Sequence, residues 1–276
     1  MKKVLIIFCA WLFSNSLQAQ ELYVFSEPAS NMPANTFSPK LKATLGGRPD
    51  SNTFQRYTPE IMFGFSKEFM LHLAASFSNM HTSDVKWESF FAYGKYRFYS
   101  KDEVHRHFRM AVFAEGGYSD NPLYFDEISV RGDNSGFDLG LIATQLINKT
   151  AFSLTTSYVK VYGEKPEHAH HELVRSAINY SLSAGQLILP VEYTSYEQLN
   201  FNIYLEILGQ HALDKNAWFI DAAPAIQFIF NSNSKLNLGY RFQLNGNALR
   251  RVDNSFLISF EHTFFNALKK KKAKKA

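Results

Sequence analysis

The chain has 276 residues, of which 29 are Lys or Arg and 25 are Asp or Glu, and its formal net charge is +4. Aromatic residues make up 16% of the chain, yet its mean hydropathy is only −0.22. The aromatic content excludes an intrinsically disordered protein, the single Cys excludes a disulfide scaffold, and the mean hydropathy excludes a membrane protein with several apolar helices.

The beginning of the chain has the layout of a secretory signal peptide. Lys2 and Lys3 precede the apolar residues 4–13, and small and polar residues follow up to Ala19. The apolar run is too short to span a bilayer stably. We therefore expect residues 1–19 to be a signal peptide that is cleaved off, and residues 20–36 to form an N-terminal periplasmic segment. Cys9 lies inside the signal peptide, so the mature chain has no cysteine.

The next part of the chain is dominated by a pattern with a period of two. Leu236, Leu238 and Tyr240 alternate with polar residues and glycine, which places apolar side chains on one face of a strand and polar ones on the other. The same alternation recurs along the chain. It predicts about twelve strands, at residues 37–45, 57–65, 69–77, 90–98, 108–118, 137–144, 152–158, 174–182, 201–207, 218–228, 236–244 and 255–265.

The predicted connections alternate in length. Residues 66–68, 147–150 and 231–234 form tight turns, whereas residues 46–56, 78–88, 119–135, 161–171, 209–216 and 245–253 form longer polar loops. Two connections depart from this alternation, because 100–107 is of medium length and 183–198 is long on the side of the short turns. Short periplasmic turns and long outer loops are typical of outer-membrane barrels.

These features predict an all-β fold: a single antiparallel transmembrane β-barrel of about 12 strands over residues 37–265, with short periplasmic turns and longer outer loops. The predicted strands are near the 9–11 residues that a spanning strand needs, and aromatic residues near their ends suit the two bilayer interfaces. A soluble β-sandwich or a lipocalin-like barrel is the alternative, and strand number and loop asymmetry argue against it.

The end of the chain carries most of the positive charge. Six of the last eight residues are Lys, so we expect residues 266–276 to be a Lys-rich disordered tail, either simply solvated or in contact with anionic groups. Without these six and without Lys2 and Lys3, 21 basic residues stand against 25 acidic ones. The folded part is thus slightly acidic, which argues against a nucleic acid partner.

Charged side chains occupy the polar face of several predicted strands and are expected to line the lumen. They are Lys95, Arg97, Arg109, Glu115, Asp138, Arg175, Glu206, Asp221 and Arg241. Mixed charges in a lumen set a preference for ions or solutes. They equally form salt-bridge networks that fill a narrow barrel. The sequence leaves both interpretations open.

A His-rich stretch lies in the fourth predicted outer loop. His168, His170 and His171 stand between Glu167 and Glu172, and imidazoles beside carboxylates suit Cu(II), Zn(II) or Ni(II). On a mobile loop without supporting neighbours such a site is weak, and a plain polar loop is the competing interpretation. We expect no other cofactor. Catalysis is not predicted, because the chain has no phosphate-binding glycine loop, no metalloprotease motif and no His-x-Ser-Asn-Gly motif of barrel phospholipases.

Several stretches resemble an uncharacterised family of outer-membrane β-barrel proteins of Gram-negative bacteria, often labelled porin-like or transporter. They are residues 25–34, 93–98, 106–110, 134–137, 140–146 and 229–233. The resemblance covers nearly the whole mature chain. It implies a barrel in the outer membrane and no established substrate.

Three functions follow as hypotheses. The first is a narrow porin or transport channel for small solutes or ions, with metal as one conceivable cargo. The second is a non-conducting binding barrel whose His-containing loop captures metal or a partner, and the third, least favoured, is an outer-membrane lipid hydrolase. The expected partners are outer-membrane lipid, the barrel-assembly machinery during biogenesis, and an unidentified small solute or ion.

Overall fold

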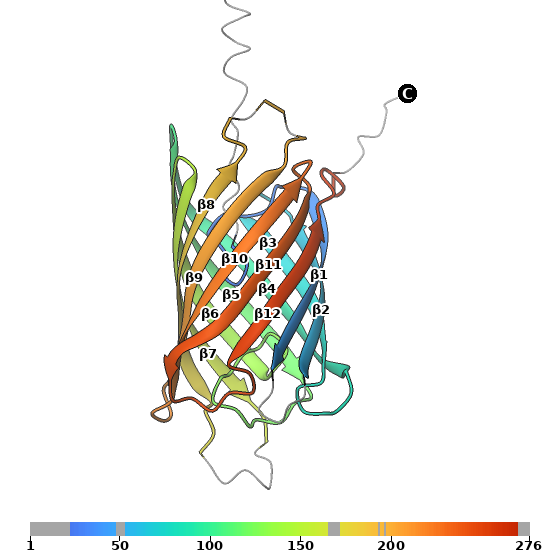
Figure 1. Cartoon of the computed structure of the whole chain (residues 1–276), viewed down its shortest axis with the longest axis vertical. Helices are drawn as coiled ribbons and strands as arrows, with labels where there is room; N and C mark the ends of the chain where they lie inside the picture. Colours follow the sequence, from blue (N-terminus) through green and yellow to red (C-terminus); the bar gives the residue numbers. More distant parts are fainter. Residues whose placement is uncertain (1–22, 48–52, 165–171, 193, 196, 270–276) are drawn as a thin grey trace, which may run out of the picture.

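Twelve antiparallel strands follow one another around a closed barrel in the computed structural model (Figure 1). The structure describes residues 23–47, 53–164, 172–192, 194–195 and 197–269. The strands are β1 (Thr36–Gly47), β2 (Thr53–Gly64), β3 (Phe69–Ser78), β4 (Lys86–Glu103), β5 (Arg106–Ser119), β6 (Ser135–Ile147), β7 (Thr150–Tyr162), β8 (Ser176–Leu189), β9 (Asn200–Ala212), β10 (Trp218–Phe230), β11 (Ser234–Gly246) and β12 (Asn254–His262). β1 pairs with β12 and closes the barrel, so the predicted all-β, twelve-stranded fold is confirmed. Among the described residues, no helix is long and apolar enough to cross a membrane.

Side chains alternate between the two faces of the wall, as the period of two predicts. In β12, Phe256, Ile258 and Phe260 are 60%, 45% and 52% exposed on the outside, whereas Ser259 and Glu261 are buried inside. An outer face of large apolar side chains around a polar interior suits a barrel surrounded by hydrocarbon.

The two ends of the barrel differ in their connections. At one end, which we call the turn end, lie the connections β2–β3, β4–β5, β6–β7, β8–β9 and β10–β11, together with the start of β1 and the end of β12. The longer connections β3–β4, β5–β6, β7–β8 and β11–β12 lie at the opposite end, the loop end, with β1–β2 and β9–β10. In Figure 1 the turn end is at the top.

Two predicted connections are shorter than expected because strand pairing continues into them. Residues 100–107 form a hairpin in which Glu103 pairs with Arg106 across a two-residue turn. A register shift between Arg97 and Tyr99 precedes this extension, and it leaves Tyr99 exposed although the alternation predicts that it points inward. Likewise, β8 continues to Leu189, so that the long connection predicted at 183–198 shrinks to residues 190–199.

Candidate functional site: the barrel lumen

Residues 23–34, which belong to the segment 20–36 expected in the periplasm, run inside the barrel. The buried carboxylate of Glu206 on β9 accepts hydrogen bonds from the backbone N–H groups of Val24, Phe25 and Ser26, at 2.9, 2.9 and 2.8 Å. An ionised carboxylate only accepts hydrogen bonds, so three converging N–H donors match it well. We call residues 23–34 the N-terminal segment.

A second anchor holds the same segment from the opposite wall. Lys95 on β4 donates from Nζ to the carbonyl oxygens of Pro28 and Ser30, at 2.6 and 2.9 Å, and lies 3.5 Å from the Glu27 carboxylate. Arg109 on β5 donates to Ser30 Oγ at 2.8 Å. Lys95 and Arg109, two of the charged residues predicted to line the lumen, thus bind the N-terminal segment of the same chain.

Apolar packing also holds the N-terminal segment in place. We call the lumen residues that contact this segment its seat. Tyr23 packs in a buried cluster with Leu146, Ala151, Tyr204 and Ala225. Further along, Ala29 packs among Tyr93, Ala111, Phe113 and Ile142 on β4, β5 and β6. Both clusters lie inside the lumen, so the segment is held by shape as well as by hydrogen bonds.

The β5–β6 connection enters the lumen from the loop end. The backbone N–H of Ile128 donates a hydrogen bond to Gln210 Oε1 at 3.0 Å. In return, Gln210 Nε2 donates to the backbone carbonyl oxygen of Ile128 at 2.8 Å. Leu123, Ile128 and Val130 are buried in an apolar cluster that includes Val159 on β7. We call residues 120–134 the inward loop.

Ion pairs fix the inward loop to the wall at three places. Arg131 Nε lies 2.8 Å from a Glu115 carboxylate oxygen on β5. Glu127 pairs with Arg241 on β11 and with Arg250, at 2.9 and 2.8 Å. Burial opposes ionisation of Glu127, but the two arginines outweigh it and lower the pKa of this carboxyl from 4.5 to about 2.

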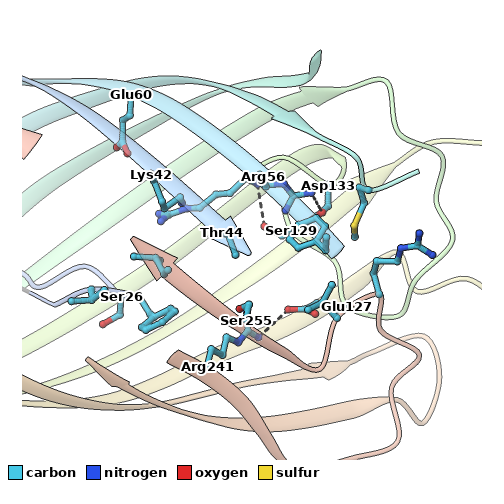
Figure 2. Close-up of a pocket in the computed structure, with 18 of the residues that line it drawn as sticks. Ser26, Lys42, Thr44, Arg56, Glu60, Glu127, Ser129, Asp133, Arg241 and Ser255 are labelled. Atoms are coloured by element: carbon cyan, nitrogen blue, oxygen red, sulfur yellow. Dashed lines mark hydrogen bonds and ion pairs between the residues drawn. The ribbon is translucent and has the colours of Figure 1, made fainter. Parts of the chain in front are cut away.

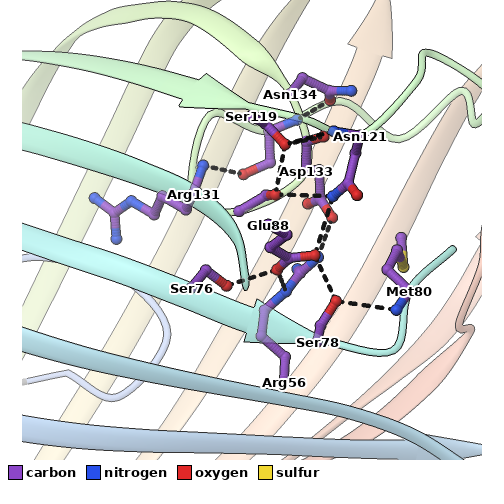
Figure 3. Close-up of polar contacts among 12 residues, drawn as sticks. Arg56, Ser76, Ser78, Met80, Glu88, Ser119, Asn121, Arg131, Asp133 and Asn134 are labelled. Atoms are coloured by element: carbon purple, nitrogen blue, oxygen red, sulfur yellow. Dashed lines mark hydrogen bonds and ion pairs between the residues drawn. The ribbon is translucent and has the colours of Figure 1, made fainter. Parts of the chain in front are cut away.

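The third place is a network centred on Glu88 at the loop end of β4 (Figure 3). Arg56 on β2 donates to Glu88 at 2.6 Å and also pairs with Asp133 of the inward loop. Glu88 accepts further hydrogen bonds from Ser76, Ser78 and Asn121. The network ties β2, β3, β4 and the inward loop together.

Two cavities remain between these elements and the β1, β2, β11 and β12 side of the wall. The loop-end cavity, of about 240 Å³, extends to Met80 and Arg251 in the long connections (Figure 2). The turn-end cavity, of about 320 Å³, extends to Lys67 in the β2–β3 turn. Both cavities are lined by Tyr23, Glu27 and Lys40. They therefore lie on either side of these three residues, one toward each end of the barrel.

The protein is similar in structure to a COG4313 outer membrane channel from Pseudomonas putida F1, with a TM-score of 0.57, 12% identity, and coverage of 88% of this chain and 100% of that one. The protein has the fold of an outer-membrane channel. The KdgM porin gives a TM-score of 0.46 at 12% identity, covering 82% of this chain and 99% of its own. The NanC porin gives 0.49 at 11% identity, covering 80% and 98%. No family model and no curated protein matches the sequence.

The channel fold places most of the predicted lumen residues inside. Lys95, Arg109, Glu115, Glu206 and Asp221 are buried within the barrel. Arg97 lines the turn-end cavity and Arg241 lines the loop-end cavity. Asp138 lines a third cavity, of about 230 Å³, together with Asn179 and Gln210. Arg175 differs: it precedes β8, is exposed, and donates to the carbonyl of Gly163. The predicted strand 174–182 begins before β8, and outside a strand the alternation no longer fixes the direction of a side chain.

Several lumen residues were missed by the sequence reasoning. Lys40, Lys42 and Arg56 line the loop-end cavity from β1 and β2, and Glu127 and Arg131 enter with the inward loop. The polar positions of the predicted strand 37–45 indicate Lys40 and Lys42, whereas Arg56 lies in the predicted connection 46–56, one residue before the predicted strand 57–65. Leu123, Ile128 and Val130 in an otherwise polar connection were the available signal for the inward loop.

The predicted metal ligands His168, His170 and His171 lie outside the described residues. Within the described ranges, no group of three or more His, Cys, Asp or Glu side chains is arranged to hold a metal ion. Metal binding by the His-rich loop stays a prediction from the sequence.

Proposed function

We propose that the protein is a narrow channel for small hydrophilic solutes or ions in the outer membrane, reached after removal of residues 1–19. The observation that carries this proposal is the pair of cavities with polar lining, which have Tyr23, Glu27 and Lys40 in common and extend toward opposite ends of the barrel.

The route is narrow because the N-terminal segment and the inward loop occupy much of the lumen. Several charged side chains along it are fixed by ion pairs, for example Lys40 with Glu60 at 3.7 Å and Lys235 with Glu261 at 2.9 Å. Fixed charges at close quarters select among permeating ions and small solutes. No catalytic step is part of the proposal, because the sequence carries none of the hydrolase motifs that such a barrel would need.

Planar-bilayer recording of the purified full chain tests the proposal. We expect discrete steps of current with a small unitary conductance. Insertion is verified separately by the shift in gel migration between unheated and boiled samples, which reports a folded barrel. A barrel that inserts in this folded form and passes no current would overturn the proposed channel.

A further inference from the structure

An excess of cationic groups surrounds the loop-end cavity. Six cationic side chains contribute to its lining: Lys40, Lys42, Arg56, Arg131, Arg241 and Arg251. Four carboxylates face them: Glu27, Glu60, Glu127 and Asp133. The cations outnumber the carboxylates in the lining itself, and Arg56, Arg131 and Arg241 are also paired with Glu88, Glu115 and Asp221 just outside it.

Each of the four carboxylates is already engaged by a cation. Glu27 lies 3.5 Å from Lys95, which stands outside the cavity lining, and Glu60 lies 3.7 Å from Lys40. Glu127 is paired with Arg241, as described above. Asp133 is paired with Arg56. Glu60 is the one of these carboxylates whose charge also acts on Lys42, and no ion pair joins the two side chains.

Lys42 on β1 is the cation left over. It makes no ion pair and no hydrogen bond with any described residue, although Figure 2 shows its side chain directed into the cavity. Its neighbours across the pairing of β1 are Thr58 and Ser259, which are neutral. A partly buried ammonium group with no counter-charge in contact is costly unless an anion or water satisfies it.

Two hydroxyl groups line the same cavity as this ammonium group. Thr44 follows Lys42 on the same face of β1, and Ser255 comes from the start of β12. Both side chains line the cavity and neither forms a hydrogen bond with a described residue. One ammonium and two hydroxyls are donors suited to an oxyanion.

From this arrangement we propose that the loop-end cavity binds a small oxyanion, a carboxylate or phosphate group on a molecule of few heavy atoms, with Lys42 as its main counter-charge. A volume of about 240 Å³ is below the range of about 300–1,000 Å³ that is common for drug-sized ligands, which restricts the occupant to small molecules. The inference deepens the proposed channel function, because such a site gives the channel a preference for anions.

Binding is tested first in detergent solution, without reference to transport. Titration calorimetry with sodium phosphate and with sodium acetate at low ionic strength measures the dissociation constant for each probe. We expect binding of at least one probe, weakened by added salt because charge attraction is screened. Lys42→Met should raise the dissociation constant at least tenfold, since one charge-assisted hydrogen bond is lost. Lys42→Arg should retain most of the affinity.

Lys101→Met is the matched control, because Lys101 is exposed on the β4–β5 hairpin and its side chain pairs with Glu103 at 2.8 Å, away from the cavity. Its affinity should equal that of the unchanged protein. If Lys42→Met does not fold, Thr44→Val with Ser255→Ala provides a second test that keeps the charge and removes both hydroxyls. Absence of binding by the unchanged protein, or equal affinity in the Lys42→Met and Lys101→Met proteins, would overturn the proposed site.

Reversal potentials separate this inference from the channel proposal. In a KCl gradient across a bilayer, the unchanged protein should favour chloride, and Lys42→Glu should shift the reversal potential toward that of potassium. Current without anion preference, together with no binding, would refute the oxyanion site and leave the channel intact. Binding without current would refute the channel and leave the site intact.

Discussion

The attachment of the N-terminal segment to Glu206 yields the sharpest prediction. Three backbone N–H groups converge on this carboxylate at 2.8–2.9 Å. Glu206→Gln keeps one acceptor oxygen and turns the other into an NH₂ donor that faces N–H groups. Hydrogen bonds to charged groups contribute about 1.5–3 kcal/mol each. Loss of one such bond and weakening of the others should therefore cost about 3 kcal/mol of attachment, which shifts release of the segment about 100-fold.

Release can be measured by thiol labelling, because the mature chain is expected to contain no cysteine. Ser26→Cys is nearly isosteric and places a thiol where Ser26 Oγ now lies 2.9 Å from Ser183 Oγ. A maleimide reagent larger than the cavity labels this thiol only when the segment leaves its seat. The labelling rate then follows the population of the released state, and it should rise about 100-fold when Glu206→Gln is added.

Two further variants make the test decisive. Glu192→Gln makes the same chemical change at an exposed position in the β8–β9 connection, and should leave the labelling rate unchanged. Gly239→Ala introduces a Cβ 2.6 Å from the ring of Phe25, and should speed labelling by steric displacement without any change in charge. Equal labelling rates with and without Glu206→Gln would refute the assignment of Glu206 as an anchor.

Two other predictions concern the inward loop and the wall. The pKa of Glu127 is about 2 in the folded protein against an ordinary 4.5, so its contribution to stability, at most about 3 kcal/mol, is complete above about pH 4.5 and is lost as the pH falls through about 2. Glu127→Gln should remove this part of the pH dependence of the unfolding temperature, measured by circular dichroism. An unchanged pH profile would contradict the pairing with Arg241. Gly140→Ala would place a Cβ 2.5 Å from the Phe113 ring and should lower the free energy of unfolding by about 1–3 kcal/mol. Gly94→Ala is the control, because the nearest neighbour of its Cβ would be 3.8 Å away and little effect is expected. Equal unfolding temperatures of the two variants in gel-shift assays would count against this packing.

The wall of the barrel was predictable because its two faces meet different surroundings. Phe256, Ile258 and Phe260 point outward, whereas Ser259 and Glu261 point inward. Apolar and polar residues therefore alternate in the sequence with a period of two. The same regularity fails wherever pairing slips by one residue. The register shift between Arg97 and Tyr99 is an example, since nothing in the composition of β4 distinguishes that position.

The contents of the lumen were much less predictable. The N-terminal segment is bound largely through its backbone atoms, such as the N–H groups of Val24 and Phe25 and the carbonyl of Pro28, and every sequence has these atoms. Side-chain patterns therefore carry little trace of it. For the charges, the sequence predicted which of them face inward but not their partners, because Glu127 and Arg241 lie far apart in the chain and meet only through the folded inward loop.

The seat of the N-terminal segment also has a consequence for the order of assembly. The segment is synthesised before any strand, yet its partners lie 67 residues away in Lys95, 115 in Thr144 and 182 in Glu206. Contacts between such distant parts of a chain form late, because the intervening chain must first be ordered. Ten of the twelve strands, up to β10 with Ala225, must exist before these contacts are complete. The N-terminal segment is thus synthesised first among the described residues but is among the last to reach its final position. We therefore expect an assembling barrel to pass through a stage in which this segment does not yet occupy the lumen.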